Sequence, residues 1–213
     1  MKPTTRRESI AGQAGAIEVA LDAPEHGPAR GFALIAHPHP LFGGTMDNKV
    51  VTTLARAANS VGLAAVRFNF RGVGASAGVF DEGTGETADF LAVYAWASGH
   101  VQGGVRKLAG FSFGAFVAAQ AAQQLQASAG EHHHHLFLAG VATSRFAVPV
   151  VDPSTVVVHG ELDDVVPLAS VMDWARPQEL PIVVIPGASH FFDRKLSLIK
   201  RLAVDAFAAE RNN

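Results

Sequence analysis

The sequence predicts an α/β protein with a mostly parallel central sheet and helices on both faces. Short apolar runs alternate with longer segments of helical periodicity, and no linker divides the 213 residues. The short runs are mostly apolar along their length, as is typical of parallel strands whose two faces are both covered by helices. We therefore expect residues 1–213 to form a single domain of this class.

The predicted strands are short apolar segments that end at glycine, proline or polar residues. They are residues 31–36, 63–70, 105–111, 136–141, 155–158 and 182–185. The earlier stretch 16–21 alternates in polarity, which predicts an antiparallel edge strand. In a sheet of this kind ligands bind beyond the carboxyl ends of the parallel strands, so functional side chains are expected there.

The predicted helices separate these strands and have apolar residues at helical spacing. They are residues 47–61, 84–96, 113–126 and 195–209. Thr45 or Asp47 is expected to cap the first helix, and Thr84 is a candidate cap for the second. The third is rich in alanine and apolar nearly all round, so we expect it to lie between the sheet and other packed structure. Residues 72–85 are rich in glycine and predict a long loop.

The amino-acid composition excludes several classes of protein. Hydrophobic residues make up 48% of the chain and charged residues 17%, which supports a sizeable core and excludes disorder. The net charge of -2 argues against a nucleic-acid or anionic-membrane partner. The absence of cysteine excludes disulfides, thiolate metal sites and a cysteine nucleophile. Without a membrane-spanning run or an apolar stretch behind the basic N-terminus, we expect a soluble, cytoplasmic protein.

The segment Gly110-Phe111-Ser112-Phe113-Gly114 lies between a predicted strand and a predicted helix. This is the G-x-S-x-G pattern of a nucleophile elbow, in which a tight turn exposes the serine hydroxyl above the sheet. The backbone N–H of Phe113 then points toward the same place from the helix N-terminus, where it could stabilise an oxyanion. The alternative is a glycine-rich turn with an ordinary serine.

An acid and a histidine follow later strands. Asp163 and Asp164 come after the strand 155–158, and either could orient a histidine while the other caps the helix after Pro167. His190 lies on the loop after the strand 182–185, so it could reach over the sheet edge to Ser112. A solvent-exposed loop histidine is the alternative. The chain order is serine, acid, histidine.

With these motifs the chain resembles the α/β-hydrolase superfamily, in particular its small lidless carboxylesterase and dienelactone-hydrolase-like branch. The resemblance extends from His37 to the closing helix, and its carriers are the segments 37–46, 68–76, 110–114, 159–163 and 187–191. It implies the α/β-hydrolase fold and a Ser112, Asp163, His190 triad. Its H-G-x-x-D pattern selects Asp163 over Asp164 as the acid.

The resemblance also implies a second oxyanion donor on the loop after the strand 31–36. Relatives often have H-G-x there, and aligning His37-Pro38-His39 on that pattern places the donor at the backbone of His39. Pro38 departs from the pattern, and neither it nor Pro40 has an N–H to donate. Leu41 is the alternative donor if the register differs.

The spacing of the last strands predicts that no cap domain is present. Only residues 142–154 separate two strands between which relatives insert a lid. We therefore expect an open cleft suited to short or medium acyl chains. Leu41, Phe42 and Phe191 are predicted to bind substrate. Three more phenylalanines are placed at the rim, of which the second and third could equally belong to the core: Phe113, Phe146 and Phe192.

Other motifs have ordinary explanations. The tract His132 to His135 is interpreted as a solvated loop at the far end of the sheet, the alternative being a metal site. The pair His37 and His39 resembles an amidohydrolase metal motif, but the chain is too short for that barrel. The glycines of residues 72–78 lack a phosphate-binding pattern, and Arg71 is expected to anchor that loop.

The sequence thus predicts a serine hydrolase that cleaves small-molecule carboxylic esters through an acyl-enzyme, without a metal or cofactor. The same triad could act on a thioester, lactone or peptide bond, because a fold does not select the bond. A non-catalytic binding protein on the same fold and a metal-dependent hydrolase are the alternatives from other classes. Nothing in the sequence indicates the oligomeric state.

Overall fold

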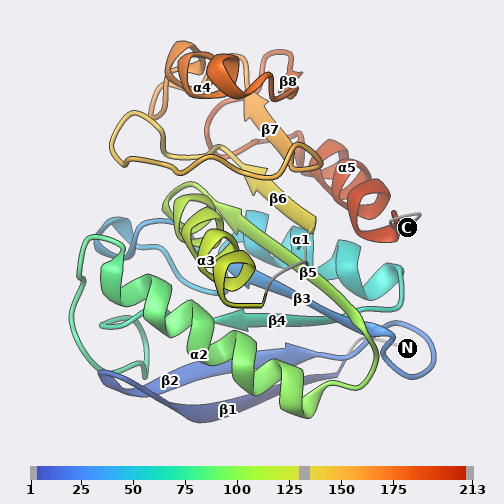
Figure 1. The fold of residues 1–213 in the computed structure, drawn as a ribbon. Coiled ribbons are helices and arrows are strands. Elements are labelled where there is room, and N and C mark those ends of the chain that lie inside the picture. Colours follow the sequence, from blue (N-terminus) through green and yellow to red (C-terminus); the bar gives the residue numbers. More distant parts are fainter. Residues whose placement is uncertain (1–3, 130–134, 210–213) are drawn as a thin grey trace.

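The computed structural model describes residues 4–129 and 135–209. Its centre is an eight-stranded sheet in the order β1-β2-β4-β3-β5-β6-β7-β8 (Figure 1). Six strands are parallel: β3 (Gly31–Ala36), β4 (Ala64–Phe68), β5 (Val105–Phe111), β6 (His135–Ala139), β7 (Val156–Gly160) and β8 (Ile182–Ile185). The predicted mostly parallel sheet is confirmed. Its parallel strands bring their carboxyl ends to one edge.

The antiparallel end of the sheet differs from the prediction in one respect. β1 (Thr5–Gly12) and β2 (Gly15–Asp22) form a hairpin, and β2 also pairs with β4. The stretch 16–21 is therefore an antiparallel strand as predicted, but not an edge strand, because β1 lies outside it. β1 was not predicted from the sequence, because most of its side chains are polar and exposed and so form no apolar pattern.

Helices cover both faces, as predicted. α2 (Thr84–His100) and α3 (Phe113–Ala129) lie on the face nearer the viewer in Figure 1, and α1 (Lys49–Ser60) and α5 (Leu196–Ala208) lie behind the sheet. Each face has its own apolar core, and α4 (Leu168–Ala175) contributes to the core of the α2 and α3 face. Two short 3₁₀ helices, η1 (Pro40–Phe42) and η2 (Arg176–Gln178), complete the described elements.

The helix starts differ from the predicted caps by small shifts. The cap of α1 is Asn48 rather than Thr45 or Asp47, since its side chain accepts a hydrogen bond from the N–H of Val50. The cap of α2 is Gly83 rather than Thr84, and Gly83 has a φ of 104°, which favours glycine. Several capping residue types within four positions compete for one site, so sequence alone does not choose among them.

The connection between β6 and β7 confirms that no cap domain is present. Residues 140–155, all of them described, contain neither helix nor strand. The carboxyl edge of the sheet is thus not covered by an inserted domain. Within the described ranges, no helix is both long enough and apolar enough to cross a membrane.

A buried ion pair joins the hairpin to the parallel part of the sheet. Arg67 on β4 and Asp22 on β2 are each 6% exposed, and the guanidinium meets the carboxylate through two hydrogen bonds of 2.7 and 3.1 Å. The same guanidinium donates to the carbonyl of Met46 at 2.8 Å and to the exposed Asp47 at 2.9 Å. Each buried charge therefore depends on its partners, since an unpaired buried charge is costly.

We expect Asp22→Ala to lower the free energy of unfolding by about 3–5 kcal/mol, because it leaves the Arg67 charge buried without its main partner. Urea denaturation at neutral pH measures the change. The exposed pair of Asp173 and Arg176, whose side chains are 71% and 67% exposed, provides the matched control. Asp173→Ala should leave the urea midpoint close to that of the parent, because exposed pairs contribute little. Equal losses in both variants would contradict the interpretation.

Candidate active site

The site is built around the turn between β5 and α3. Ser112 occupies this turn with a φ of 57°, a left-handed conformation that is strained for a residue with a side chain. A Cβ at Gly110 would lie 2.1 Å from the Gly114 carbonyl oxygen, and one at Gly114 would lie 2.4 Å from the His37 carbonyl oxygen. Both glycines are therefore required by close backbone approach. The predicted nucleophile elbow is present in the structure.

Three side chains from distant loops meet at this turn. The Nε2 atom of His190 lies 2.9 Å from the Ser112 hydroxyl oxygen, although 78 residues separate them in the chain. The Nδ1 atom of His190 lies 2.7 Å from Asp163 Oδ2. The two loops that carry Asp163 and His190 follow β7 and β8, so all three residues lie at the carboxyl ends of parallel strands. All three are buried.

Asp163 is held in its orientation by the backbone of its own turn. Its Oδ1 atom accepts hydrogen bonds from the N–H groups of Val165 and Val166, at 3.0 and 2.7 Å. Burial acts to raise the pKa of Asp163, but the hydrogen bonds from His190 and Val166 outweigh it and hold this pKa below its usual value. Asp163 is thus an ionised carboxylate at neutral pH.

The neighbouring Asp164 is not part of this arrangement. Its side chain is exposed, whereas Asp163 contacts His190 directly. The alternative that one of these acids caps the following helix is also settled, because α4 has Pro167 as its N-cap and no side chain caps it. Of the two acids considered from the sequence, the structure brings only Asp163 to the histidine.

The hydrogen-bond chain assigns the His190 tautomer. A carboxylate can only accept, so Nδ1 must carry the hydrogen that faces Asp163. Nε2 is then free to accept the hydroxyl hydrogen of Ser112. This is the arrangement in which an imidazole can remove a proton from a serine while an acid stabilises the resulting imidazolium.

Two backbone N–H groups are candidates to stabilise an oxyanion beside Ser112. Phe113 is the first residue of α3, so its N–H has no helical carbonyl one turn earlier to bond. On the loop after β3, the N–H of Leu41 already donates to the His39 ring at 3.2 Å. Because the N–H of Leu41 already has an acceptor, the N–H of His39 is favoured as the second oxyanion donor. The carbonyl of His39 accepts from Phe42 and Gly44, which fixes the loop.

His37, which also follows β3, has a structural role instead. Its Nδ1 donates to the Pro38 carbonyl at 2.6 Å, and its Nε2 accepts the N–H of Phe70 at 3.0 Å. Burial lowers the pKa of His37 to about 4, although the Pro38 carbonyl acts in the opposite direction. Both ring nitrogens are occupied and the ring is neutral, so His37 joins the loops after β3 and β4.

The apolar residues predicted at the rim divide into two groups. Leu41, Phe42 and Phe191 are 68%, 72% and 43% exposed, so they are available to a ligand. Phe113 and Phe192 have no exposed surface, because both side chains belong to the apolar cores. The predicted place of Phe113 on the rim is therefore wrong, and for Phe192 the alternative of a core residue holds. The half-buried Phe146 stacks on Phe116 with ring centres 4.7 Å apart.

The remaining sequence motifs lie apart from Ser112 or have structural roles. Arg71 anchors its loop as expected, through hydrogen bonds of 2.9 and 2.8 Å to Asp89. Residues 132–134 of the histidine tract lie outside the described residues, and His135 begins β6 at the opposite end of the strands. No group of three or more potential metal ligands is found among residues 4–129 and 135–209.

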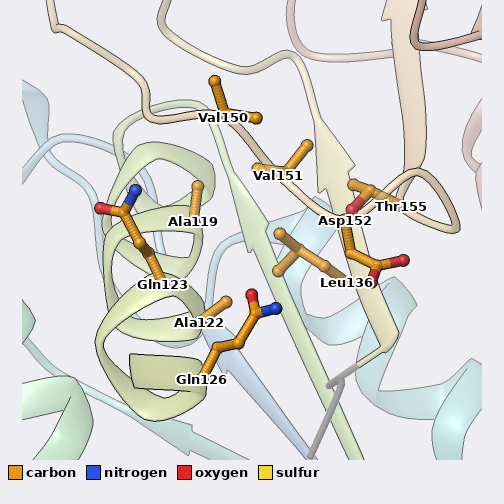
Figure 2. Close-up of a pocket in the computed structure, with 9 residues that line it drawn as sticks. All are labelled: Ala119, Ala122, Gln123, Gln126, Leu136, Val150, Val151, Asp152 and Thr155. Atoms are coloured by element: carbon orange, nitrogen blue, oxygen red, sulfur yellow. The ribbon is translucent and has the colours of Figure 1, made fainter. Parts of the chain in front are cut away.

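A surface hollow between α3 and the segment before β7 is separate from this site (Figure 2). Its lining comes from the second half of α3, the start of β6 and the segment that leads into β7, at the ends of the strands opposite Ser112. The lining residues are Ala119, Ala122, Gln123, Gln126, Leu136, Val150, Val151, Asp152 and Thr155. None of the three hydrogen-bonded site residues is among them.

Two further residues of the site were not predicted to contact the acid or the histidine. Gly140, with a φ of 54°, follows β6, and a Cβ there would lie 3.3 Å from Cε1 of His190, so its lack of a side chain leaves room for the imidazole. His159 lies beside Asp163, with 3.3 Å between its Nε2 and Asp163 Oδ2. A glycine after an apolar run is not a specific signal for Gly140, whereas His159 is the first residue of the H-G-x-x-D pattern that indicated Asp163.

This arrangement of sheet, elbow and three-residue chain defines a serine hydrolase of the α/β-hydrolase class without a lid. The comparisons place the chain there directly. Residues 19–130 match the family model described as X-Pro dipeptidyl-peptidase (S15 family), and the chain belongs to this family within the α/β hydrolases.

Individual relatives agree with this assignment. The uncharacterized protein RP471 of Rickettsia prowazekii is 31% identical over 87% of this chain and 82% of its own length. XC6422 from Xanthomonas campestris, an α/β serine hydrolase without lid, is 34% identical with a TM-score of 0.86, over 95% of this chain and 93% of that one. An α/β serine hydrolase homologue from Coxiella burnetii is 37% identical with a TM-score of 0.80, over 94% and 96%.

The fold is also shared with more distant enzymes. Dienelactone hydrolase from Anabaena variabilis is 21% identical with a TM-score of 0.72, over 97% of this chain and 98% of that one. At this identity the likeness concerns the fold alone. The predicted membership of the α/β hydrolases without a lid is confirmed by the family model and by XC6422.

The neutral His37 predicts a pH dependence of stability. Its pKa is about 4 in the folded protein against 6.5 ordinarily, so the unfolded chain binds a proton more readily than the folded one in this interval. The contribution is complete above pH 6.5 and is lost as the pH falls toward 4. We expect about 3 kcal/mol of unfolding free energy to be lost through His37.

Urea denaturation at several pH values between 7 and 4 measures this loss, which should be smaller in His37→Gln. A glutamine retains a hydrogen-bonding side chain but does not titrate. An identical pH dependence in parent and variant would show that the proton is taken up elsewhere.

Proposed function

We propose that the protein hydrolyses carboxylic esters with Ser112 as nucleophile, His190 as general base and Asp163 as the orienting acid. The observation that supports this most is the continuous chain of contacts, 2.9 Å from Ser112 to His190 and 2.7 Å from His190 to Asp163. Nucleophile, base and acid are in hydrogen-bond reach, which is the geometry that this chemistry requires.

The proposed reaction has two halves. His190 Nε2 takes the hydroxyl proton while Ser112 Oγ forms a bond to the ester carbonyl carbon, and the carbonyl electron pair moves to its oxygen. When the tetrahedral intermediate collapses, the bond to the alcohol oxygen breaks and the imidazolium returns the proton to that alcohol. A water molecule then repeats both steps on the acyl-serine, which releases the carboxylic acid and restores Ser112.

Asp163 contributes in both halves by stabilising the imidazolium. Its carboxylate faces Nδ1 of His190 and stays ionised at neutral pH, since its pKa is lowered despite burial. It also holds the ring in the tautomer that leaves Nε2 ready to accept. The oxyanion is proposed to bind the N–H groups of Phe113 and His39, and one such donor typically contributes about 3 kcal/mol.

The proposed substrate is a small-molecule ester of short to medium acyl chain. The exposed Leu41, Phe42 and Phe191 offer apolar surface, and no cap domain covers the carboxyl edge of the sheet. The family description names a dipeptidyl-peptidase, and a peptide, thioester or lactone bond would pass through the same acyl-enzyme. We propose esters first because an alcohol leaves a tetrahedral intermediate more readily than an amine.

We expect Ser112→Ala to lower the kcat for p-nitrophenyl acetate by at least about 10³-fold, because no other group replaces the nucleophile. A fluorophosphonate should label the parent at Ser112, as seen by peptide mass spectrometry, and should not label the variant. EDTA in the assay tests the metal-dependent alternative and should leave the rate unchanged. Parental activity in Ser112→Ala would refute the assignment of the nucleophile.

The two adjacent acids provide a matched pair of variants. Asp163→Asn should lower kcat by roughly 10³–10⁴-fold, because an amide can present its NH₂ to His190 and so favour the wrong tautomer. Asp164→Asn changes the exposed side chain of the next residue along the chain and should retain the parental kcat. Steady-state kinetics on both variants show which of the two is the orienting acid. A larger loss of kcat in Asp164→Asn than in Asp163→Asn would assign that role to Asp164.

A further inference from the structure

His159 at the end of β7 is a fully buried histidine that the proposed reaction does not use. Its side chain has no exposed surface, and Nε2 lies 2.9 Å from the Val166 carbonyl oxygen and 3.3 Å from Asp163 Oδ2. Both neighbours are acceptors, so the hydrogen of a neutral ring must be on Nε2. Burial lowers the pKa of His159, which keeps the ring neutral.

The other nitrogen of the His159 ring, Nδ1, contributes no stabilising hydrogen bond within the described residues. Nδ1 is buried and has no hydrogen-bond partner within the described part of the chain. A buried polar atom without a partner costs free energy. A leucine would fill a similar volume without that cost, so the packing of β7 does not explain a histidine at this position.

The contacts of His159 Nε2 form a closed network with Val166 and Asp163. His159 holds the carbonyl of Val166, and the N–H of the same Val166 donates to Asp163 Oδ1 at 2.7 Å. Asp163 Oδ2 then lies between two imidazoles, 3.3 Å from His159 Nε2 and 2.7 Å from His190 Nδ1. Both carboxylate oxygens are therefore confined, one by backbone donors and one by the two rings.

From this geometry we propose that His159 is a positioning residue for Asp163. Its Nε2–H fixes the turn 163–166 and faces Oδ2, so that the carboxylate stays aimed at His190 and the plane of the carboxylate cannot rotate away. The proposal rests on the proposed function, in which Asp163 orients His190. His159 transfers no proton and touches no substrate, and acts only through the acid.

Two substitutions separate the hydrogen bond from the volume. His159→Leu removes the donor, and His159→Gln supplies an N–H from a side chain of similar reach. We expect His159→Leu to lower kcat for p-nitrophenyl acetate by roughly 10–100-fold with KM unchanged. This is the range typical of losing an outer residue that orients a metal-ligating side chain, a role comparable to the one proposed for His159. His159→Gln should recover most of that loss. Equal kcat values in the two variants, or a parental kcat in His159→Leu, would overturn the proposal.

A double-mutant cycle tests whether His159 acts through Asp163. In an Asp163→Ala background there is no carboxylate to orient, so adding His159→Leu should change the residual kcat by less than about twofold. A full loss in that background would show a general structural effect and overturn the proposal. If Asp163→Ala alone retains the parental kcat, the proposed function fails instead, because the acid then has no role. Melting temperatures of all variants identify losses caused by unfolding.

A measurement on the parent protein is independent of activity. The ¹⁵N chemical shifts of the imidazole rings distinguish the two neutral tautomers, and the His159→Gln spectrum assigns the resonances. We expect His159 to carry its hydrogen on Nε2 at neutral pH. A hydrogen on Nδ1 would remove the donor from Val166 and Asp163, and would refute the proposal.

Discussion

The buried carboxylate of Asp163 is the group on which the candidate site depends. A charge in a protein interior is costly unless each lone pair is matched by a donor. Here two backbone N–H groups hold Oδ1, and His190 holds Oδ2. The arrangement that stabilises the charge also fixes the direction in which it acts. His190 therefore faces Ser112 in the required tautomer. The proposed reactivity of the Ser112 hydroxyl thus depends on a carboxylate that it does not contact directly and that acts through the His190 ring.

The fold supplies this placement through the ends of its parallel strands. The parallel strands β5, β7 and β8 end at one edge of the sheet, so the turn with Ser112 and the loops with Asp163 and His190 converge there. The elbow is held by close backbone contacts at Gly110 and Gly114, which offset the strained conformation of Ser112. The loops after β3 and β4 are joined by the neutral ring of His37. Rigid elements thus confine every group that the proposed chemistry needs.

Sequence reasoning succeeded where local pattern and global fold agree. The strands 31–36 and 182–185 were predicted with their observed bounds, because continuous apolar runs that end before proline or polar residues have few other interpretations. It failed for β1, whose exposed polar residues form a strand only because β2 offers a pairing edge. The placement of Phe113 on the rim was wrong, and the choice between rim and core for Phe192 stayed open, for a similar reason. A phenylalanine next to a site residue points either to the ligand or to the core, and backbone geometry decides which.

The order and spacing of the serine, the acid and the histidine, together with the alternation of strands and helices, were by themselves sufficient to predict the fold class, Ser112 and His190, and to narrow the acid to Asp163 or Asp164. These features are local or follow from the rule that parallel strands end at one edge. The choice between Asp163 and Asp164, the tautomers of His37 and His190, and the contact of His159 with the acid were decided only by the tertiary structure. Each depends on distances of about 3 Å between individual atoms, which the folded backbone sets and no sequence pattern specifies.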